Sequence, residues 1–78
     1  MKTIELKVYA GMSKGWILDG KCHRENDQPA FIYNDGSLCW YRRGFRHREW
    51  NKPAVIRSDG LREWFYNGSF LKNELVNK

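Results

Sequence analysis

The sequence predicts an all-β fold, an antiparallel meander of about six short strands built from 24-residue hairpin repeats. When the chain is shifted by 24 residues it matches itself, and a tryptophan recurs in register at Trp16, Trp40 and Trp64. An internal repeat of this kind determines the architecture of a chain. Helix has little support, because Gly or Pro interrupts every window of helical length and the remaining segments are rich in β-branched and aromatic residues.

The repeat divides the 78 residues into an N-terminal segment and three units. We predict a single domain over 1–78, with a strand and turn over 1–15, repeats over 16–39 and 40–63, and a truncated repeat over 64–78. Residues 3–9 alternate between apolar and polar side chains, which is the period of a half-buried strand. We expect residues 71–78 to fray, because chain ends are poorly ordered unless they are tied down.

Two-residue turn signals separate the predicted strands. Asp-Gly and Asn-Gly pairs suit the positive φ angles of a type I′ hairpin turn, and an Arg-Gly pair takes the same place in the middle unit. The pairs are Asp19-Gly20, Asp35-Gly36, Arg43-Gly44, Asp59-Gly60 and Asn67-Gly68. A tight hairpin at each pair predicts these opposite partners: Trp16 with His23, Phe31 with Trp40, Trp40 with His47, Val55 with Trp64, Arg57 with Arg62, and Trp64 with Leu71.

A histidine recurs with the repeat, as His23 and His47, each within a His-Arg-Glu sequence. Histidine and glutamate can serve acid–base catalysis. However, a catalytic set is needed once, and in the third unit Leu71 stands at the histidine position, which suits packing and not proton transfer. We therefore predict no enzyme and no cofactor. The residues assigned to the structure of the repeat are Trp16, Trp40, Trp64, His23, His47, Gly20, Gly44 and Gly68.

The composition of the chain limits the kinds of partner and location that we expect. The net charge of +5 and the pI of about 9.5 suit an anionic partner without identifying one. The N-terminus has no apolar core of signal-peptide length, and no run approaches the roughly 18 apolar residues of a membrane span. We therefore expect a cytoplasmic protein that does not enter a membrane.

The two cysteines, Cys22 and Cys39, form a poor disulfide framework, and a cytosolic protein keeps its thiols reduced. Together with the histidines they also offer zinc-type ligands. The only close pair is Cys22 and His23, and adjacent residues of a strand point to opposite faces. We therefore predict no metal site.

Trp50 is the most informative residue for binding. It lies in a loop, where the first repeat has Asn26, and basic residues surround it. Tryptophan and arginine dominate the energy of many interfaces, although Trp50 could instead be a lid over the small core. The candidate residues for binding a protein or another anionic partner are Trp50, Arg42, Arg43, Arg46, Arg48, Arg57 and Arg62.

The same stretch leaves an alternative function open. Arginine forks bind phosphates, and the aromatic rings within 40–50 could stack on bases, so nucleic-acid binding through this stretch is the alternative. A meander also has two edge strands, here near residues 4–9 and near Phe70, which can pair with another chain. These edges are candidate sites for a homodimer.

The pattern W-Y-x-x-G-x-x-H-R-E-x-x-x-P-A-x-I-x-x-D-G-x-x-x-W, read here from Trp40 to Trp64, resembles the MORN-variant repeats of bacteria and their phages. The resemblance covers residues 16–71. It implies stacked hairpins and binding rather than catalysis, and some relatives are antitoxins or small phage proteins. It favours an inhibitor of a bacterial host or defence protein, or an antitoxin. The expected partner is then a bacterial host protein with an acidic surface, met in the host cytoplasm if a phage encodes the chain.

Overall fold

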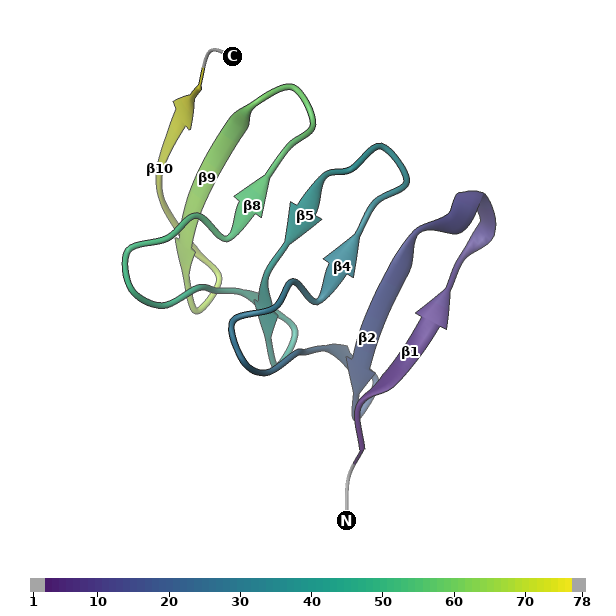
Figure 1. The fold of residues 1–78 in the computed structure, drawn as a ribbon. Coiled ribbons are helices and arrows are strands. Elements are labelled where there is room, and N and C mark those ends of the chain that lie inside the picture. Colours follow the sequence, from purple (N-terminus) through teal and green to yellow (C-terminus); the bar gives the residue numbers. More distant parts are fainter. Residues whose placement is uncertain (1–2, 77–78) are drawn as a thin grey trace.

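The computed structural model describes residues 3–76 and confirms the all-β class (Figure 1). Ten strands and one turn of 3₁₀ helix occur in this part of the chain. They are β1 (Glu5–Val8), η1 (Ala10–Met12), β2 (Lys14–Leu18), β3 (Lys21–Cys22), β4 (Phe31–Ile32), β5 (Leu38–Cys39), β6 (Tyr41–Arg42), β7 (Phe45–Arg46), β8 (Val55–Ile56), β9 (Leu61–Tyr66) and β10 (Ser69–Leu75).

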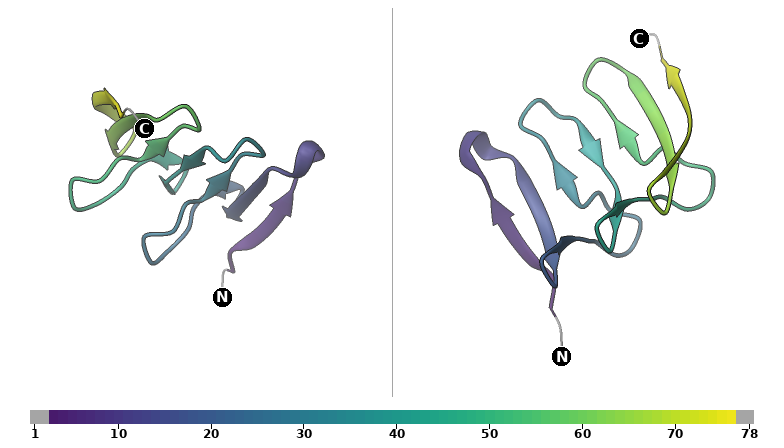
Figure 2. Two further views of the ribbon diagram at one scale, coloured as in Figure 1. Left: turned by 45° about the horizontal axis from the view of Figure 1, so that its top comes forward. Right: turned by 180° about the vertical axis from the view of Figure 1, so that it is seen from behind.

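Most strands belong to one antiparallel sheet with the order β1-β2-β4-β5-β8-β9-β10, and β3 pairs with β2. The hairpins β1–β2, β4–β5 and β8–β9 follow one another across this sheet (Figure 1). β6 and β7 form a separate two-stranded sheet. Residues 24–28 and 48–52 form two loops that project from the same side of the molecule (Figure 2). We call them the first and the second loop.

One of the strands beyond the predicted six arises because the chain changes sheet at a tryptophan. β5 ends at Cys39 and β6 begins at Tyr41. Between them, the Trp40 N–H donates to the carbonyl of Ala54 at 2.7 Å, and the Trp40 carbonyl accepts from the His47 N–H at 3.1 Å. Trp40 therefore joins the large sheet to the small one, and one expected strand becomes two.

Three turns have the predicted type I′ conformation, with two positive φ angles each: Asp19-Gly20, Arg43-Gly44 and Asn67-Gly68. They confirm the facing of Trp16 with His23 and of Trp40 with His47, since Ile17 pairs with Cys22 and Tyr41 with Arg46. These turns also stack along the repeat. The Gly44 N–H donates to the Cys22 carbonyl, and the Gly68 N–H donates to the Arg46 carbonyl, each at 2.8 Å.

The two turns at Asp35-Gly36 and Asp59-Gly60 are different, and the register predicted from them is wrong by one residue. Only the glycine has a positive φ there. The aspartate carboxylate instead accepts from the N–H two residues on, at Ser37 and Leu61. This lengthens the loop to three residues.

The longer loop changes which side chains face each other. Phe31 pairs with Cys39 rather than Trp40, and Val55 pairs with Glu63 rather than Trp64. The predicted facing of Arg57 with Arg62 is also wrong: Arg62 pairs with Ile56, and the guanidinium of Arg57 bonds Glu63 at 3.0 Å. The repulsion expected between two opposed arginines is therefore replaced by an ion pair.

The expectations for both ends of the sheet also need correction. β1 is a strand, but all four of its residues are exposed, because no second layer covers this edge. The predicted fraying of the tail is wrong for residues 71–75, which belong to β10, and residues 72–75 pair with β9. Residues 77–78 lie outside the described part. A register shift between Phe70 and Lys72 places Lys72, not Leu71, opposite Trp64.

The core is small and lies along the repeat. It contains Ala30, Cys39, Trp40, Ala54, Val55 and Trp64 together with the buried polar residues His23, Ser37 and His47. A cation lies against each recurring tryptophan: Arg24 on Trp16, Arg48 on Trp40 and Lys72 on Trp64. Each cation follows its tryptophan by eight residues in the sequence, so this contact repeats with the fold. Between residues 3 and 76, no helix is long and apolar enough to cross a membrane.

Candidate functional site

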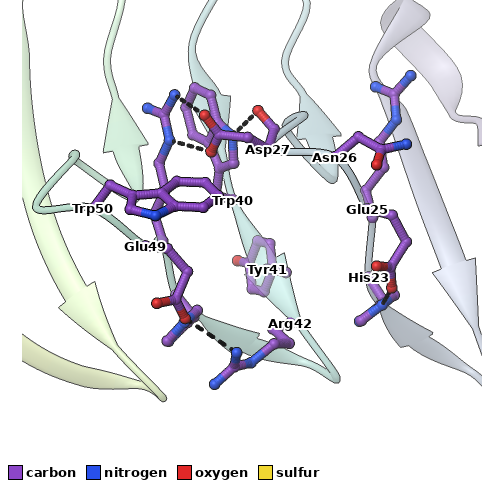
Figure 3. A pocket seen from close by; sticks show the side chains of 12 residues that line it. His23, Glu25, Asn26, Asp27, Trp40, Tyr41, Arg42, Glu49 and Trp50 are labelled. Carbon is purple, nitrogen blue, oxygen red and sulfur yellow. Dashed lines mark hydrogen bonds and ion pairs between the residues drawn. The ribbon is translucent and has the colours of Figure 1, made fainter.

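A cleft of about 330 Å³ opens between the first and second loops (Figure 3). Trp50 and Glu49 lie on one side of it, and Glu25 and Asn26 lie on the other (Figure 3). We call it the inter-loop cleft. Its lining comprises His23, Arg24, Glu25, Asn26, Asp27, Trp40, Tyr41, Arg42, His47, Arg48, Glu49 and Trp50.

Each loop is a tight turn with two consecutive residues at positive φ. In the first loop these are Asn26 and Asp27, with φ of 61° and 56°, and in the second they are Trp50 and Asn51, with φ of 61° and 55°. Asn and Asp adopt this conformation readily, whereas for a bulky residue it is an outlier that costs about 1–3 kcal/mol. The second loop therefore holds a tryptophan in a conformation that suits asparagine better.

A buried histidine supports each loop from below. The Nε2 atom of His23 bonds the carboxylate of Glu25, and the Nε2 atom of His47 bonds the carboxylate of Glu49. On the other side of each ring, Nδ1 accepts from a backbone N–H, of Arg43 at 3.0 Å and of Asn67 at 2.9 Å.

These contacts distinguish a structural role of the two imidazole rings from a role in proton transfer. A backbone N–H can only donate, so Nδ1 is the acceptor and the ring proton lies on Nε2. Both nitrogens of each ring are engaged within the chain. The geometry therefore favours the structural interpretation of the histidines: each connects its loop to the turn that begins 20 residues later.

Asp27 joins the two loops across the cleft (Figure 3). Its carboxylate accepts from Arg48 Nε at 2.9 Å and Nη2 at 3.3 Å, and from Lys52 Nζ at 3.1 Å. The hydrogen bond from Arg48 is the main reason that the pKa of Asp27 lies below its usual value, and the bond from Lys52 adds to it. The Asp27 carbonyl also accepts from Trp40 Nε1 at 3.0 Å. The first loop is thus fastened to the second by its side chain and to the core by its backbone.

Arg48 is held on three sides. Its guanidinium lies 3.7 Å from the centre of the Trp40 ring, bonds Asp27, and donates from Nη1 to the Pro53 carbonyl at 3.0 Å. Its side chain is only 12 % exposed. The predicted binding residue Arg48 therefore acts mainly inside the wall of the cleft.

Arg42 closes the cleft at the other end. Its Nη1 donates to Glu49 at 3.1 Å and its Nη2 donates to the side-chain oxygen of Asn67 at 2.9 Å. The hydrogen bond from His47 is the main cause that lowers the pKa of Glu49, and Arg42 adds to it. Cations and carboxylates alternate around the cleft, which leaves it without a strong charge of one sign.

Trp50 is the exposed aromatic group of this site. Its side chain is 72 % exposed, so it does not form a lid over the core. The nearest cation is Lys52, whose Nζ lies 5.9 Å from the ring centre. In the first loop Asn26 takes the same place with the same φ, so the indole is an addition to a turn that forms without it.

The other predicted arginines do not join this site. Arg43 is exposed and lines a second hollow with Arg42, Phe45 and Asn67. Arg46 donates to the Tyr41 hydroxyl at 3.4 Å, and it shares a third hollow with Arg57. Arg57 and Arg62 line a fourth. The structure thus brings Trp50, Arg42 and Arg48 together and distributes the rest, because alternation along short strands sends neighbours to opposite faces.

Sequence reasoning missed the acidic and polar half of the cleft. Asp27 is the clearest case, because its carboxylate holds both basic residues of the second loop. A signal was present: position 27 carries a carboxylate where the next repeat has the amide Asn51. Such a departure from the repeat marks a contact that is made once.

The cysteines take no part in the cleft. Cys39 is buried and Cys22 half-buried, they are not joined to each other, and burial raises the pKa of both thiols. Over residues 3–76 no group of three or more potential ligands lies close enough to hold a metal ion. No protein-family model, curated protein or solved structure matches this chain.

Proposed function

We propose that this chain is a non-enzymatic binding protein that acts by stoichiometric association with another protein, with Trp50 as its anchor and the inter-loop cleft as its docking surface. The observation that carries the proposal is the 72 % exposed indole, placed on a turn that the first repeat builds with asparagine. An exposed tryptophan at the rim of a concave surface is the kind of residue that dominates binding energy. The conformational cost of placing it there points to a role outside the core.

The rigidity of the cleft supports the same proposal. Asp27 ties the loops to each other, and His23 and His47 tie them to the turns below. A surface that is already ordered loses little conformational entropy when a partner binds. The contacts of the histidines serve this support, which favours binding over proton transfer.

The charges favour a protein partner over a nucleic acid. Arg42, Arg48 and Arg57 are each paired with a carboxylate of the same chain, so they are less available to phosphates. The net charge of +5 still favours a partner with an acidic surface. An inhibitor of a bacterial host or defence protein, or an antitoxin, is the form of this function that the resemblance to MORN-variant repeats suggests.

The test is capture of a partner by the wild type and by Trp50→Asn. This variant removes the indole and keeps the turn, because Asn26 already takes the same φ in the first loop. The matched control is Met12→Ala, which removes a side chain that is also 72 % exposed but lies in η1, outside the cleft. A protein captured from bacterial lysate is then purified and titrated by calorimetry.

We expect saturable binding at a fixed ratio for the wild type and Met12→Ala, and at least a tenfold weaker affinity for Trp50→Asn, equivalent to about 1.4 kcal/mol. Equal affinity of all three proteins would exclude Trp50 as the anchor. Random DNA and RNA are titrated in parallel at two salt concentrations. Submicromolar binding with a steep salt dependence would favour the nucleic-acid alternative instead.

A further inference from the structure

The open edge of β10 is the longest unpaired stretch of backbone among the described strands. β10 pairs with β9 on one side only and forms the end of the sheet (Figures 1 and 2). All seven of its residues are exposed. Three of them are large and apolar: Phe70, Leu71 and Leu75 are exposed by 53 %, 61 % and 64 %. An open edge of this length that exposes apolar side chains is a template for pairing with another strand.

A hydrogen bond at the end of β10 shows which of its backbone groups point to the open edge of the sheet. The Val76 N–H donates to the Gly60 carbonyl at 3.1 Å and so points toward β9. Because the direction alternates along a strand, the backbone groups of Glu74 and Lys72 also point toward β9. Those of Asn73 and Leu75 point to the open edge.

The side chains of this edge complement a second copy of themselves. We propose that β10 pairs with β10 of a second copy, antiparallel, with the two-fold axis at Asn73. Asn73 then faces Asn73, Lys72 faces Glu74, Leu71 faces Leu75, and Phe70 faces Val76. Opposite charges and apolar groups that face each other stabilise antiparallel strands. A two-fold axis makes each of these contacts twice, except that of Asn73 with Asn73, which lies on the axis.

The backbone agrees with this register. Asn73 exchanges two edge hydrogen bonds with Asn73 of the second copy, and the Leu75 N–H donates to the Leu71 carbonyl of the second copy. That carbonyl points to the open edge because the N–H of the same peptide, that of Lys72, points toward β9. The register shift between Phe70 and Lys72 interrupts the alternation at the Leu71 N–H, which is therefore not part of this ladder. Lys72 and Glu74 occupy the positions between. Such positions bring side chains closest together, at about 4.5 Å between Cα atoms. Moving the register by two residues in either direction places Lys72 opposite Lys72 or Glu74 opposite Glu74. The charges therefore select one register.

The first test is the mass of the chain in solution, measured by sedimentation equilibrium. We expect twice 9.3 kDa for the wild type. We expect 9.3 kDa for Asn73→Pro, which removes an N–H from the open edge and leaves the bonds to β9 in place. The control is Leu6→Pro at the other edge, where β1 has only four residues and contributes fewer ladder bonds. A wild type that stays at 9.3 kDa, or a Leu6→Pro variant that alone becomes monomeric, overturns the proposal.

The second test uses charge and does not rely on proline. Glu74→Lys makes Lys72 face a lysine, and Lys72→Glu makes Glu74 face a glutamate, so each variant alone should dimerise at least about tenfold more weakly. In an equal mixture the opposite charges meet again. Native mass spectrometry should then show the heterodimer in excess over both homodimers. A statistical mixture of the three dimers contradicts the assigned register.

The third test needs no variant. Amide hydrogen exchange of the wild type is followed by NMR as the protein concentration rises. The amides of Asn73 and Leu75 should become protected, and those of Lys72 and Glu74, already bonded to β9, should change little. Equal exchange of Asn73 and Leu75 at all concentrations would refute pairing at this edge. Trp50 lies outside β10, so Trp50→Asn should dimerise like the wild type, which separates this proposal from the proposed function.

Discussion

At the scale of single residues, the protein is organised by a cation placed on each tryptophan. Arg24 and Arg48 occupy equivalent positions: each lies on its tryptophan and donates to a proline carbonyl five residues ahead. They differ in one contact. Arg48 also forms a two-pronged bond with Asp27, and Arg24 has no carboxylate partner among the described residues. A comparison of Arg24 with Arg48 therefore measures how much the ion pair between the two loops contributes to the stability of the fold.

We predict that Arg48→Ala lowers the free energy of unfolding more than Arg24→Ala does, by about 1–2 kcal/mol. The value lies between that of an exposed ion pair and that of a buried hydrogen bond to a charged group. Urea denaturation followed by tryptophan fluorescence measures both variants. Equal losses would mean that the bond to Asp27 adds nothing to the stacking and the carbonyl contact.

The lowered pKa of Asp27 predicts a dependence of stability on pH. In the unfolded chain this carboxyl has a pKa of about 3.9, and in the fold its pKa is lower, mainly because Arg48 donates to it. Its contribution is therefore fully present above about pH 5 and is lost as the pH falls through the folded pKa. We expect the difference in unfolding free energy between wild type and Asp27→Asn to be constant at neutral pH and to shrink below about pH 4. A difference that does not change between pH 7 and about pH 2.5 would refute this.

At the scale of elements, two kinds of turn alternate along the chain. The type I′ turns at one end of the hairpins stack on the preceding repeat, and the three-residue turns at the other end are closed by an aspartate side chain. Gly36 and Gly60 occupy equivalent places in the second kind, with φ of 92° and 98°. A Cβ at Gly36 would meet nothing within 4 Å, whereas a Cβ at Gly60 would lie 2.5 Å from the Val76 carbonyl oxygen.

We predict that Gly36→Ala costs about 1–2 kcal/mol, which is the strain of an alanine at positive φ. Gly60→Ala pays the same strain and also displaces Val76, which breaks the bond that holds the end of β10, so its cost should be larger by about 1 kcal/mol or more. Thermal denaturation followed by circular dichroism compares the two variants. An equal loss would show that Val76 moves aside freely.

At the scale of the whole molecule, contacts between consecutive repeats hold the fold together. The Gly44 N–H bonds the Cys22 carbonyl, the Gly68 N–H bonds the Arg46 carbonyl, and each histidine ring bonds the turn of the next repeat. The middle repeat has neighbours on both sides, and its residues Trp40, His47, Ala54 and Val55 are buried. The ends of the sheet have a neighbour on one side only.

We predict that hydrogen exchange is slowest in the middle of the chain. The amides of Trp40 and Ala54 are hydrogen-bonded and belong to buried residues of the middle repeat, so they should exchange only when the whole fold opens. The Tyr9 N–H bonds Ser13, and by alternation those of Leu6 and Val8 point to the open edge of β1. These two amides should exchange fastest. Similar rates at Trp40 and Leu6 would mean that the repeats do not support one another.

Much of the fold could be predicted because it depends on local signals that recur. The 24-residue period, the type I′ turns and the facing of Trp40 with His47 all follow from residue identity and spacing. The register at Asp35 and Asp59 could not be predicted in the same way. An Asp-Gly pair suits either a two-residue or a three-residue turn, and the choice depends on whether the carboxylate bonds the backbone ahead of it.

The candidate site was predicted in part. Trp50 stood out because it departs from the repeat, whereas the arginines were grouped by their closeness in sequence and proved to lie around several hollows. The role of Asp27 could not be predicted, because its partner Arg48 is 21 positions away in the sequence and meets it only in the folded chain. The sequence by itself determined the hairpin repeat, because backbone preferences act over a few residues. Only the tertiary structure decided which charges meet across the cleft, because that depends on how two loops are placed side by side.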